Sequence, residues 1–99
     1  MGFSQEDLAK VWQKATFVSQ ENESKGFRKD HCTAWIRWSD YGNRNSVYGW
    51  EVDHITTKDD GGGDEISNLR PLHWKNNVSK SSGRLVCVVR SDGNKNVGV

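Results

Sequence analysis

The fold of this chain is decided by residues 50–80, which read WEVDHITTKDDGGGDEISNLRPLHWKNNVSK. Apolar and polar residues alternate at the start of this stretch, which predicts a strand over residues 47–55. A loop rich in glycine follows at 56–65, and a short strand is expected at 68–72. The last part predicts a helix over 73–81. The order is therefore strand, loop, strand, helix.

Three polar residues in this stretch point to chemistry. His54 ends the first strand and opens the loop, so its imidazole can face a cleft. Histidine is the side chain whose ordinary pKa lies nearest to neutrality, which makes His54 a candidate general base. Asp53 offers a hard carboxylate oxygen of the kind that Mg²⁺ prefers. Asn77, on the expected helix, would add an amide oxygen, with Asn76 as the competing candidate.

Taken in order, these residues resemble the HNH endonuclease motif in its HNN variant. Its three signature positions fall on His54, Asn68 and Asn77, with 13 and 8 residues between them. In that family a ββα unit (the His-Me finger) holds one divalent metal ion. The resemblance implies an α+β fold, with one small nuclease domain over residues 1–99 and the motif core at 50–80. An N-terminal helix and additional short strands would complete it.

The resemblance also implies a role for each residue. His54 is then the catalytic base, and a kink at the strand end lets Asp53 reach the same phosphate. Asp53 and Asn77 are the ligands of one Mg²⁺ or Mn²⁺ ion. Asn68 does not touch the metal; it ties the glycine loop together and helps to fix the backbone carbonyl that orients the imidazole of His54.

Basic residues after the loop predict contacts with nucleic-acid phosphates. Residues 31–65 are acidic on balance and residues 66–99 are basic, a pattern that can place an acidic metal pocket beside a phosphate-attracting surface. His73 shares a helix face with Asn77, although it could instead start the helix, facing solvent or bonded to the loop. Arg37 and Arg44 are weaker candidates. The expected nucleic-acid contacts are Arg70, His73, Lys75, Lys80 and Arg84.

Outside the motif, the first expected element is a helix over residues 5–16, with Ser4 as its N-cap. Residues 19–30 are polar and are expected to form a loop, followed by a strand at 31–38. A final strand is expected at 84–90, and the tail to residue 99 is expected to be frayed.

Composition adds further expectations. Cys32 and Cys87 are far apart and lack CxxC spacing, so two reduced thiols are expected, with a disulfide or a zinc knuckle as alternatives. Some HNH proteins bind a structural zinc through cysteines around the helix, where this chain has His73 and Asn76, so no structural zinc is expected. With no apolar run of membrane-spanning length and no readable signal peptide, a cytoplasmic protein is expected.

The sequence therefore predicts a metal-dependent endonuclease that nicks DNA with little sequence specificity, leaving 5′-phosphate and 3′-hydroxyl ends by resemblance. RNA stays open as a substrate. One rival is a nucleic-acid-binding module of the same fold without catalysis. Another is a nuclease toxin or effector domain controlled by an inhibitor protein. The oligomeric state and any protein partner are left open.

Overall fold

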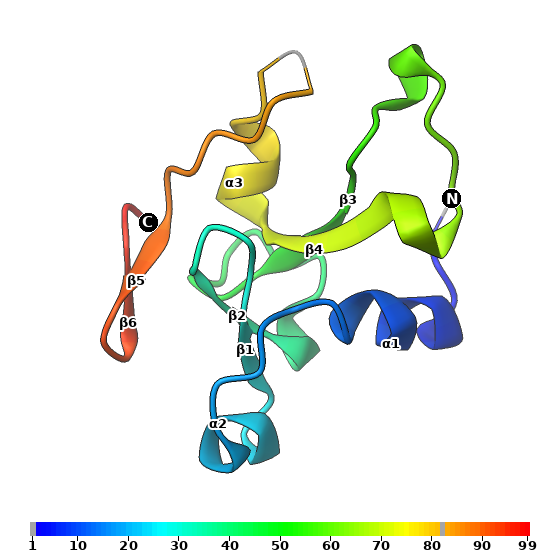
Figure 1. The fold of residues 1–99 in the computed structure, drawn as a ribbon. Coiled ribbons are helices and arrows are strands. Elements are labelled where there is room, and N and C mark those ends of the chain that lie inside the picture. The colour runs from blue at the N-terminus through cyan, green and yellow to red at the C-terminus, as the bar shows by residue number, and fades with distance from the viewer. Residues whose placement is uncertain (1, 82) are drawn as a thin grey trace.

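A computed structural model describes residues 2–81 and 83–99, and an antiparallel hairpin with one helix forms its centre (Figure 1). Strand β3 (Trp50–His54) pairs with β4 (Leu69–His73), and helix α3 (Trp74–Val78) follows β4 directly. These three elements form the expected ββα unit. The α+β fold class is thereby confirmed, although β3 and α3 are shorter than the sequence suggested and β4 lies one position later.

The alternation along β3 separates a core face from a polar face. Trp50 and Val52 pack with the core beneath helix α1 (Gln5–Trp12), and the rings of Trp50 and Trp12 lie 5.1 Å apart. On the other side, Glu51 contacts Asn77 of α3 and Asp53 contacts Lys80, just after that helix. Helices α1 and α3 accordingly lie on opposite sides of the hairpin (Figure 1). The hydrophobic cluster between α1 and the hairpin consists of the buried residues Leu8, Val11, Trp12, Ala15, Ile36, Trp50 and Leu69.

Helix α1 begins where the sequence predicted. The Ser4 hydroxyl accepts a hydrogen bond from the Asp7 backbone N–H at 3.0 Å, which confirms the N-cap. The helix ends at Trp12 rather than at residue 16, because the backbone of Thr16 pairs with Lys29 instead. That pairing draws the chain away from the helix axis and toward a second sheet.

The loop expected at residues 19–30 was wrong. This segment contains helix α2 (Gln20–Ser24), capped by Ser19, and strand β1 (Phe27–Lys29). β1 pairs antiparallel with β2 (Trp35–Arg37), the only strand within the expected 31–38. The turn between them forms because the Asp30 carboxylate accepts the backbone N–H groups of two turn residues, Cys32 and Ala34.

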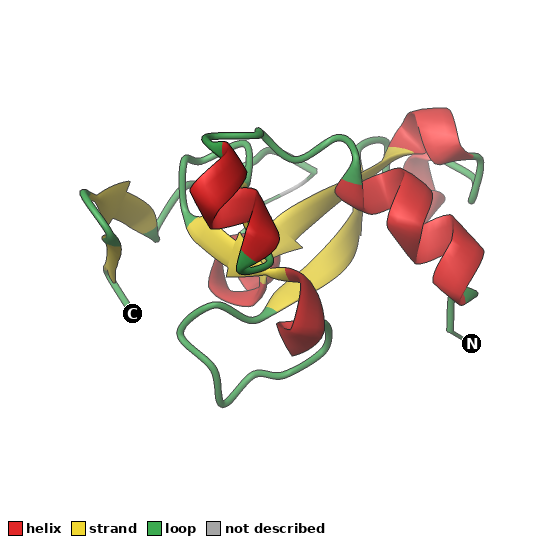
Figure 2. Ribbon diagram, turned by 90° about the horizontal axis from the view of Figure 1, so that it is seen from below, coloured by secondary structure: helices red, strands yellow, loops and turns green. Residues whose placement is uncertain are grey.

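Within the described residues, three short 3-10 helices complete the connections: η1 (Trp38–Asp40), η2 (Lys58–Asp60) and η3 (Ile66–Asn68). The last two lie in the long connection between β3 and β4, on the right of Figure 1. Figure 2 shows the helices seen from below the hairpin. None of the helices within residues 2–81 and 83–99 has the length and apolar character needed to cross a bilayer.

The strand expected at residues 84–90 was also wrong. Val88 and Val89 donate their backbone N–H groups to the side-chain amide of Asn76, both at 2.8 Å, so a side chain replaces a partner strand. Regular pairing begins only with β5 (Arg90–Asp92), which forms a hairpin with β6 (Lys95–Val97). The tail is therefore paired rather than frayed.

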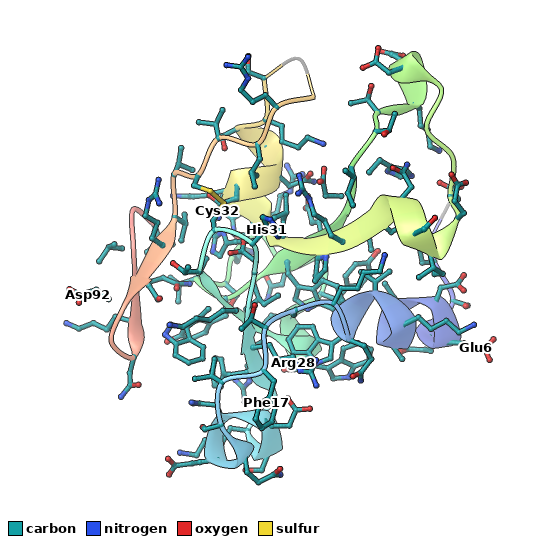
Figure 3. All side chains as sticks on the ribbon, viewed as in Figure 1. Glu6, Phe17, Arg28, His31, Cys32 and Asp92 are labelled. Carbon is teal, nitrogen blue, oxygen red and sulfur yellow. A yellow bond between two sulfur atoms is a disulfide. The ribbon has the colours of Figure 1, made fainter. Side chains whose placement is uncertain are left out.

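Cys32 and Cys87 form a disulfide, which corrects the expectation of two reduced thiols. Figure 3 shows the bond as a yellow link near the labelled Cys32. It ties the turn before β2 to the segment before β5, across 55 positions of sequence. Widely spaced cysteines carry no sequence signal for pairing, because only the fold brings them together.

Candidate active site

A cleft of about 370 Å³ opens between the end of β3, the loop after it and helix α3. Strand β3 supplies Asp53 and His54. Helix α3 supplies Asn77, and the turn after it supplies Lys80. The loop adds a threonine and a lysine. The residues that line the cleft are Val52, Asp53, His54, Thr57, Lys58, Asn77, Lys80 and Gly83.

Asp53 is almost completely buried, with 2% of its side chain exposed, and two cations hold it. Arg70 Nε donates to Oδ2 at 2.7 Å, and Lys80 Nζ donates to Oδ1 at 2.6 Å. The first contact follows from strand register, because Asp53 lies directly opposite Arg70 in the hairpin. A buried carboxylate that accepts hydrogen bonds from two cations is held in a fixed orientation.

His54 lies at the last position of β3 with its imidazole half-buried. Nε2 lies 2.6 Å from Oδ1 of Asp64, a residue of the glycine loop, and the ring of Phe3 lies 6.4 Å from the imidazole on another side. The hydrogen bond from His54, together with the nearby charge of Lys58, holds the pKa of Asp64 below its ordinary value. The orienting partner of the imidazole is thus a carboxylate, where a backbone carbonyl was expected.

Asn77 faces the cleft from α3, while its neighbour Asn76 is fully buried and bonded to Asp30. The amide nitrogen of Asn77 donates to Glu51 Oε1 at 2.9 Å. Glu51 also receives two hydrogen bonds from Arg44, at 2.6 and 2.9 Å. Burial, the largest single effect, raises the pKa of Glu51, but the hydrogen bonds from Arg44 and Asn77 and the positive charge of Arg44 together lower it, so this pKa lies below its ordinary value.

Asn68 is buried at the base of the loop and makes three hydrogen bonds across it. Its Oδ1 accepts from the backbone N–H of Thr56 at 2.8 Å. Its Nδ2 donates to the carbonyls of Thr56 and Gly63, at 3.0 and 2.9 Å. These bonds join the two ends of the loop that carries Asp64. Gly62 belongs to the same arrangement, because a Cβ there would lie 1.8 Å from the Thr56 carbonyl oxygen.

The basic residues expected to contact phosphates have different positions. Arg84 is exposed, and Lys75 extends over the ring of Trp74 at 5.5 Å. Arg70 and Lys80 are instead engaged with Asp53. Lys80 lines the cleft and Arg70 lies on β4 next to Asp53, and both are held by this carboxylate rather than extended toward solvent.

His73 is fully buried and is not available to a phosphate, which corrects that expectation. Its Nε2 donates to the Val47 carbonyl at 2.9 Å, and its Nδ1 accepts the Lys75 backbone N–H at 3.1 Å as the N-cap of α3. Burial lowers the pKa of His73 below its ordinary value. The sequence also offered the alternative that His73 starts the helix. His73 does lie at the start of α3, although its side chain faces the interior rather than solvent.

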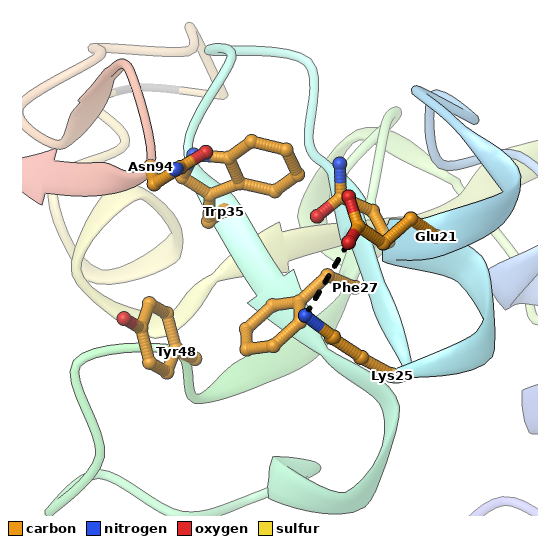
Figure 4. A pocket seen from close by; sticks show the side chains of 7 residues that line it. Glu21, Lys25, Phe27, Trp35, Tyr48 and Asn94 are labelled. Atoms are coloured by element: carbon orange, nitrogen blue, oxygen red, sulfur yellow. Dashed lines mark ion pairs between the residues drawn. The ribbon is translucent and has the colours of Figure 1, made fainter.

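A second pocket, of about 360 Å³, lies among the rings of Phe27, Trp35 and Tyr48 (Figure 4). Its rim residues Glu21 and Lys25 pair with each other at 3.9 Å. The rings contact one another edge to face, with Phe27 5.0 Å from Tyr48. Because its rim charges are mutually paired and none of the acid–base residues lines it, this aromatic pocket is not the candidate active site.

The cleft beside β3 has donors that fit a divalent ion of the Mg²⁺ type. Asp53 and Asn77 supply a carboxylate and an amide oxygen, which are hard ligands, and Mg²⁺ commonly keeps several waters besides one or two protein ligands. Within the part of the chain that the structure describes, no cluster of three or more His, Cys, Asp or Glu residues is arranged to hold a metal. A site here would therefore depend on Asn77.

The ββα unit with an acid–histidine pair at its strand end defines a class of small nuclease-like domains. The family model of the HNH endonuclease matches residues 31–83, more than half of the chain. The chain therefore belongs to the HNH endonuclease family. Searches of curated proteins and of solved structures each gave no match.

Sequence reasoning missed three residues: Lys58, which lines the cleft, and Glu51 and Asp64, which contact the cleft residues Asn77 and His54. Glu51 stands two positions before Asp53, so the alternation of the strand could have placed both on one face. Lys58 and Asp64 lie in the loop, and Asp64 stands directly after the glycines that were noted. No local pattern indicates that this loop folds back onto His54.

Proposed function

We propose that this protein is a metal-dependent endonuclease that hydrolyses DNA phosphodiester bonds in the cleft beside β3. The observation that carries this proposal is the gathering of Asp53, His54, Asn77 and Lys80 around one open cleft. It supplies a base, hard oxygen ligands and a cation in one place, which are the groups that phosphodiester hydrolysis requires. Membership of the HNH endonuclease family supports the same reaction class.

His54 acts as the general base in this proposal. Its Nε2–H donates to Asp64, which leaves Nδ1 as the nitrogen that can take a proton from the attacking water. Asp64 is thus a positioning residue that selects the tautomer. Asn68 acts one step further away, because its three hydrogen bonds hold the loop from which Asp64 reaches the imidazole.

Asp53 and Asn77 would hold one Mg²⁺ or Mn²⁺ ion. When bound, this ion supplies positive charge that stabilises the pentacovalent phosphate. Arg70 fixes the Asp53 carboxylate from the neighbouring strand. With one base and one ion there is a single cutting centre, so the protein cuts one strand at a time.

The substrate is held mainly by charge. Lys58 lines the cleft and Arg84, next to the cleft residue Gly83, is exposed, so both can contact phosphates of the substrate. Contacts of this kind bind without regard to sequence and weaken as salt concentration rises. Little sequence specificity follows from them.

A plasmid assay tests the proposal. Purified wild-type protein, His54→Ala and the control His31→Ala, which changes an exposed histidine outside the cleft, are incubated with supercoiled plasmid in Mg²⁺, Mn²⁺ or EDTA. We expect wild type and His31→Ala to nick the plasmid only when metal is present, and His54→Ala not to nick it. Nicking by His54→Ala at the wild-type rate would refute the assignment of His54 as the general base. Salt-sensitive DNA binding without cutting would instead identify a binding module.

A further inference from the structure

The side-chain amide of Asn77 can be turned two ways, and its neighbour decides between them. Its Nδ2 donates to Glu51 Oε1 at 2.9 Å. An ionised carboxylate only accepts hydrogen bonds, so the reversed amide would bring two acceptor oxygens together. Glu51 therefore holds the amide with nitrogen toward itself and with oxygen on the other branch, where it is available as a ligand.

Glu51 is itself held in place. Arg44 binds its carboxylate through two nitrogens, Nε to Oε2 at 2.6 Å and Nη2 to Oε1 at 2.9 Å. Such paired hydrogen bonds fix a carboxylate in its plane. Both oxygens of Glu51 accept hydrogen bonds, and unlike Asp53 this residue does not line the cleft, so its carboxylate acts through Asn77 rather than as a ligand of its own.

Glu51 and Asp53 stand two positions apart on β3, and so they lie on the same face of the strand, the face that α3 covers. Asp53 lines the cleft together with Asn77, whereas Glu51 does not line it. We propose that Glu51, fixed by Arg44, is the positioning residue that presents the amide oxygen of Asn77 to the divalent ion. This inference rests on the proposed function.

Metal affinity tests this role without any need for cleavage. Mn²⁺ binding to the full chain is measured by calorimetry for wild type, Glu51→Gln and the control Glu65→Gln, an exposed residue outside the cleft. A glutamine at position 51 can both donate and accept, so it no longer selects one orientation of the amide. We expect Glu51→Gln to bind Mn²⁺ about tenfold more weakly, the usual loss when a ligand's supporting partner is removed. Glu65→Gln should bind as wild type does.

A double-mutant cycle separates positioning from loss of charge. Mn²⁺ affinity is also measured for Asn77→Ala and for Asn77→Ala combined with Glu51→Gln. If Glu51 acts through Asn77, Glu51→Gln should change affinity less than about twofold once Asn77 is absent. An equal loss in both backgrounds would overturn the proposal, because it would show a general effect of charge.

The side-chain amide signal of Asn77 gives a second readout in nuclear magnetic resonance spectra. It should shift in Glu51→Gln and stay unchanged in Glu65→Gln. If wild type binds Mn²⁺ and Glu51→Gln binds it equally well, the role of Glu51 is refuted while the proposed function stands. Failure of the folded wild type to bind Mn²⁺ at all would overturn both.

Discussion

Lys80 Nζ lies 2.6 Å from Asp53 Oδ1 and also donates to the carbonyl oxygen of His54 at 2.8 Å. One ammonium group on the turn after α3 therefore holds two consecutive residues of β3. A divalent ion on Asp53 would approach the oxygen that this ammonium already contacts. Metal and lysine then compete for one carboxylate.

Replacing Lys80 with methionine tests this competition. We expect Lys80→Met to bind Mn²⁺ about tenfold more tightly, because a positive charge next to the ligand is removed. Without metal the variant should lose about 3 kcal/mol of stability, since the buried Asp53 keeps only Arg70 as a partner. Calorimetry and urea denaturation measure the two effects, with Lys95→Met in the exposed β6 as control. Unchanged Mn²⁺ affinity would contradict the competition.

Asp64→Asn tests the orientation of His54. An asparagine can present its NH₂ group to the imidazole, so the ring no longer has a fixed tautomer. We expect the nicking rate to fall about tenfold, as for other partners that orient a functional histidine. The melting temperature should stay close to that of wild type, because Asp64 is largely exposed. Asp59→Asn, in the same loop, serves as control, and a wild-type rate for Asp64→Asn would show that another group orients the base.

His73 predicts a dependence of stability on pH. Burial lowers its pKa in the folded chain, so the unfolded chain takes up the proton first as pH falls. The contribution of neutral His73 to the free energy of unfolding is complete above about pH 6.5, the ordinary pKa of histidine. Below that pH it declines by up to about 1.4 kcal/mol per pH unit. The free energy of unfolding is measured by urea denaturation between about pH 7.5 and 5.5, a range that brackets the ordinary histidine pKa of about 6.5. It should fall less steeply with decreasing pH in His73→Asn, which keeps a capping side chain, than in wild type. Equal slopes would contradict the assignment.

Reduction of the disulfide should destabilise the chain. Opening a loop of 55 positions between Cys32 and Cys87 increases the freedom of the unfolded state. We expect a loss of about 2–4 kcal/mol, measured by urea denaturation with and without reductant. The double variant Cys32→Ser, Cys87→Ser should show the lower stability in both conditions. If reductant leaves wild type unchanged, the bond does not contribute to stability.

The parts of the fold that could be predicted are those with local signals. The Ser4 cap, the alternation of β3 and the end of β4 before α3 each depend on residues close together in sequence. The motif likewise pointed to residues that the fold brings to one cleft, including His54 and Asn77. Short-range patterns thus sufficed for the ββα unit.

What could not be predicted depends on contacts between distant segments. The valines before β5 have the pattern of a strand, yet their backbone binds the side chain of Asn76. The hydrogen bond between Asp64 and His54 and the disulfide of Cys32 also arise from the path of the chain rather than from a local pattern. Such contacts follow from how the chain folds back on itself, even where the partners, like His54 and Asp64, stand only ten positions apart.

Asn76 and Asn77 face different surroundings because neighbours on a helix point about 100° apart. Asn76 makes four hydrogen bonds in the interior, with Asp30, Val88 and Val89, and these set the rotation of α3 about its own axis. Each position along α3 consequently has a fixed direction, toward the interior or toward the cleft. Deleting Lys75 would move Asn77 into the interior position and bring Val78 to the cleft, leaving an intact helix whose outward face has no oxygen to offer.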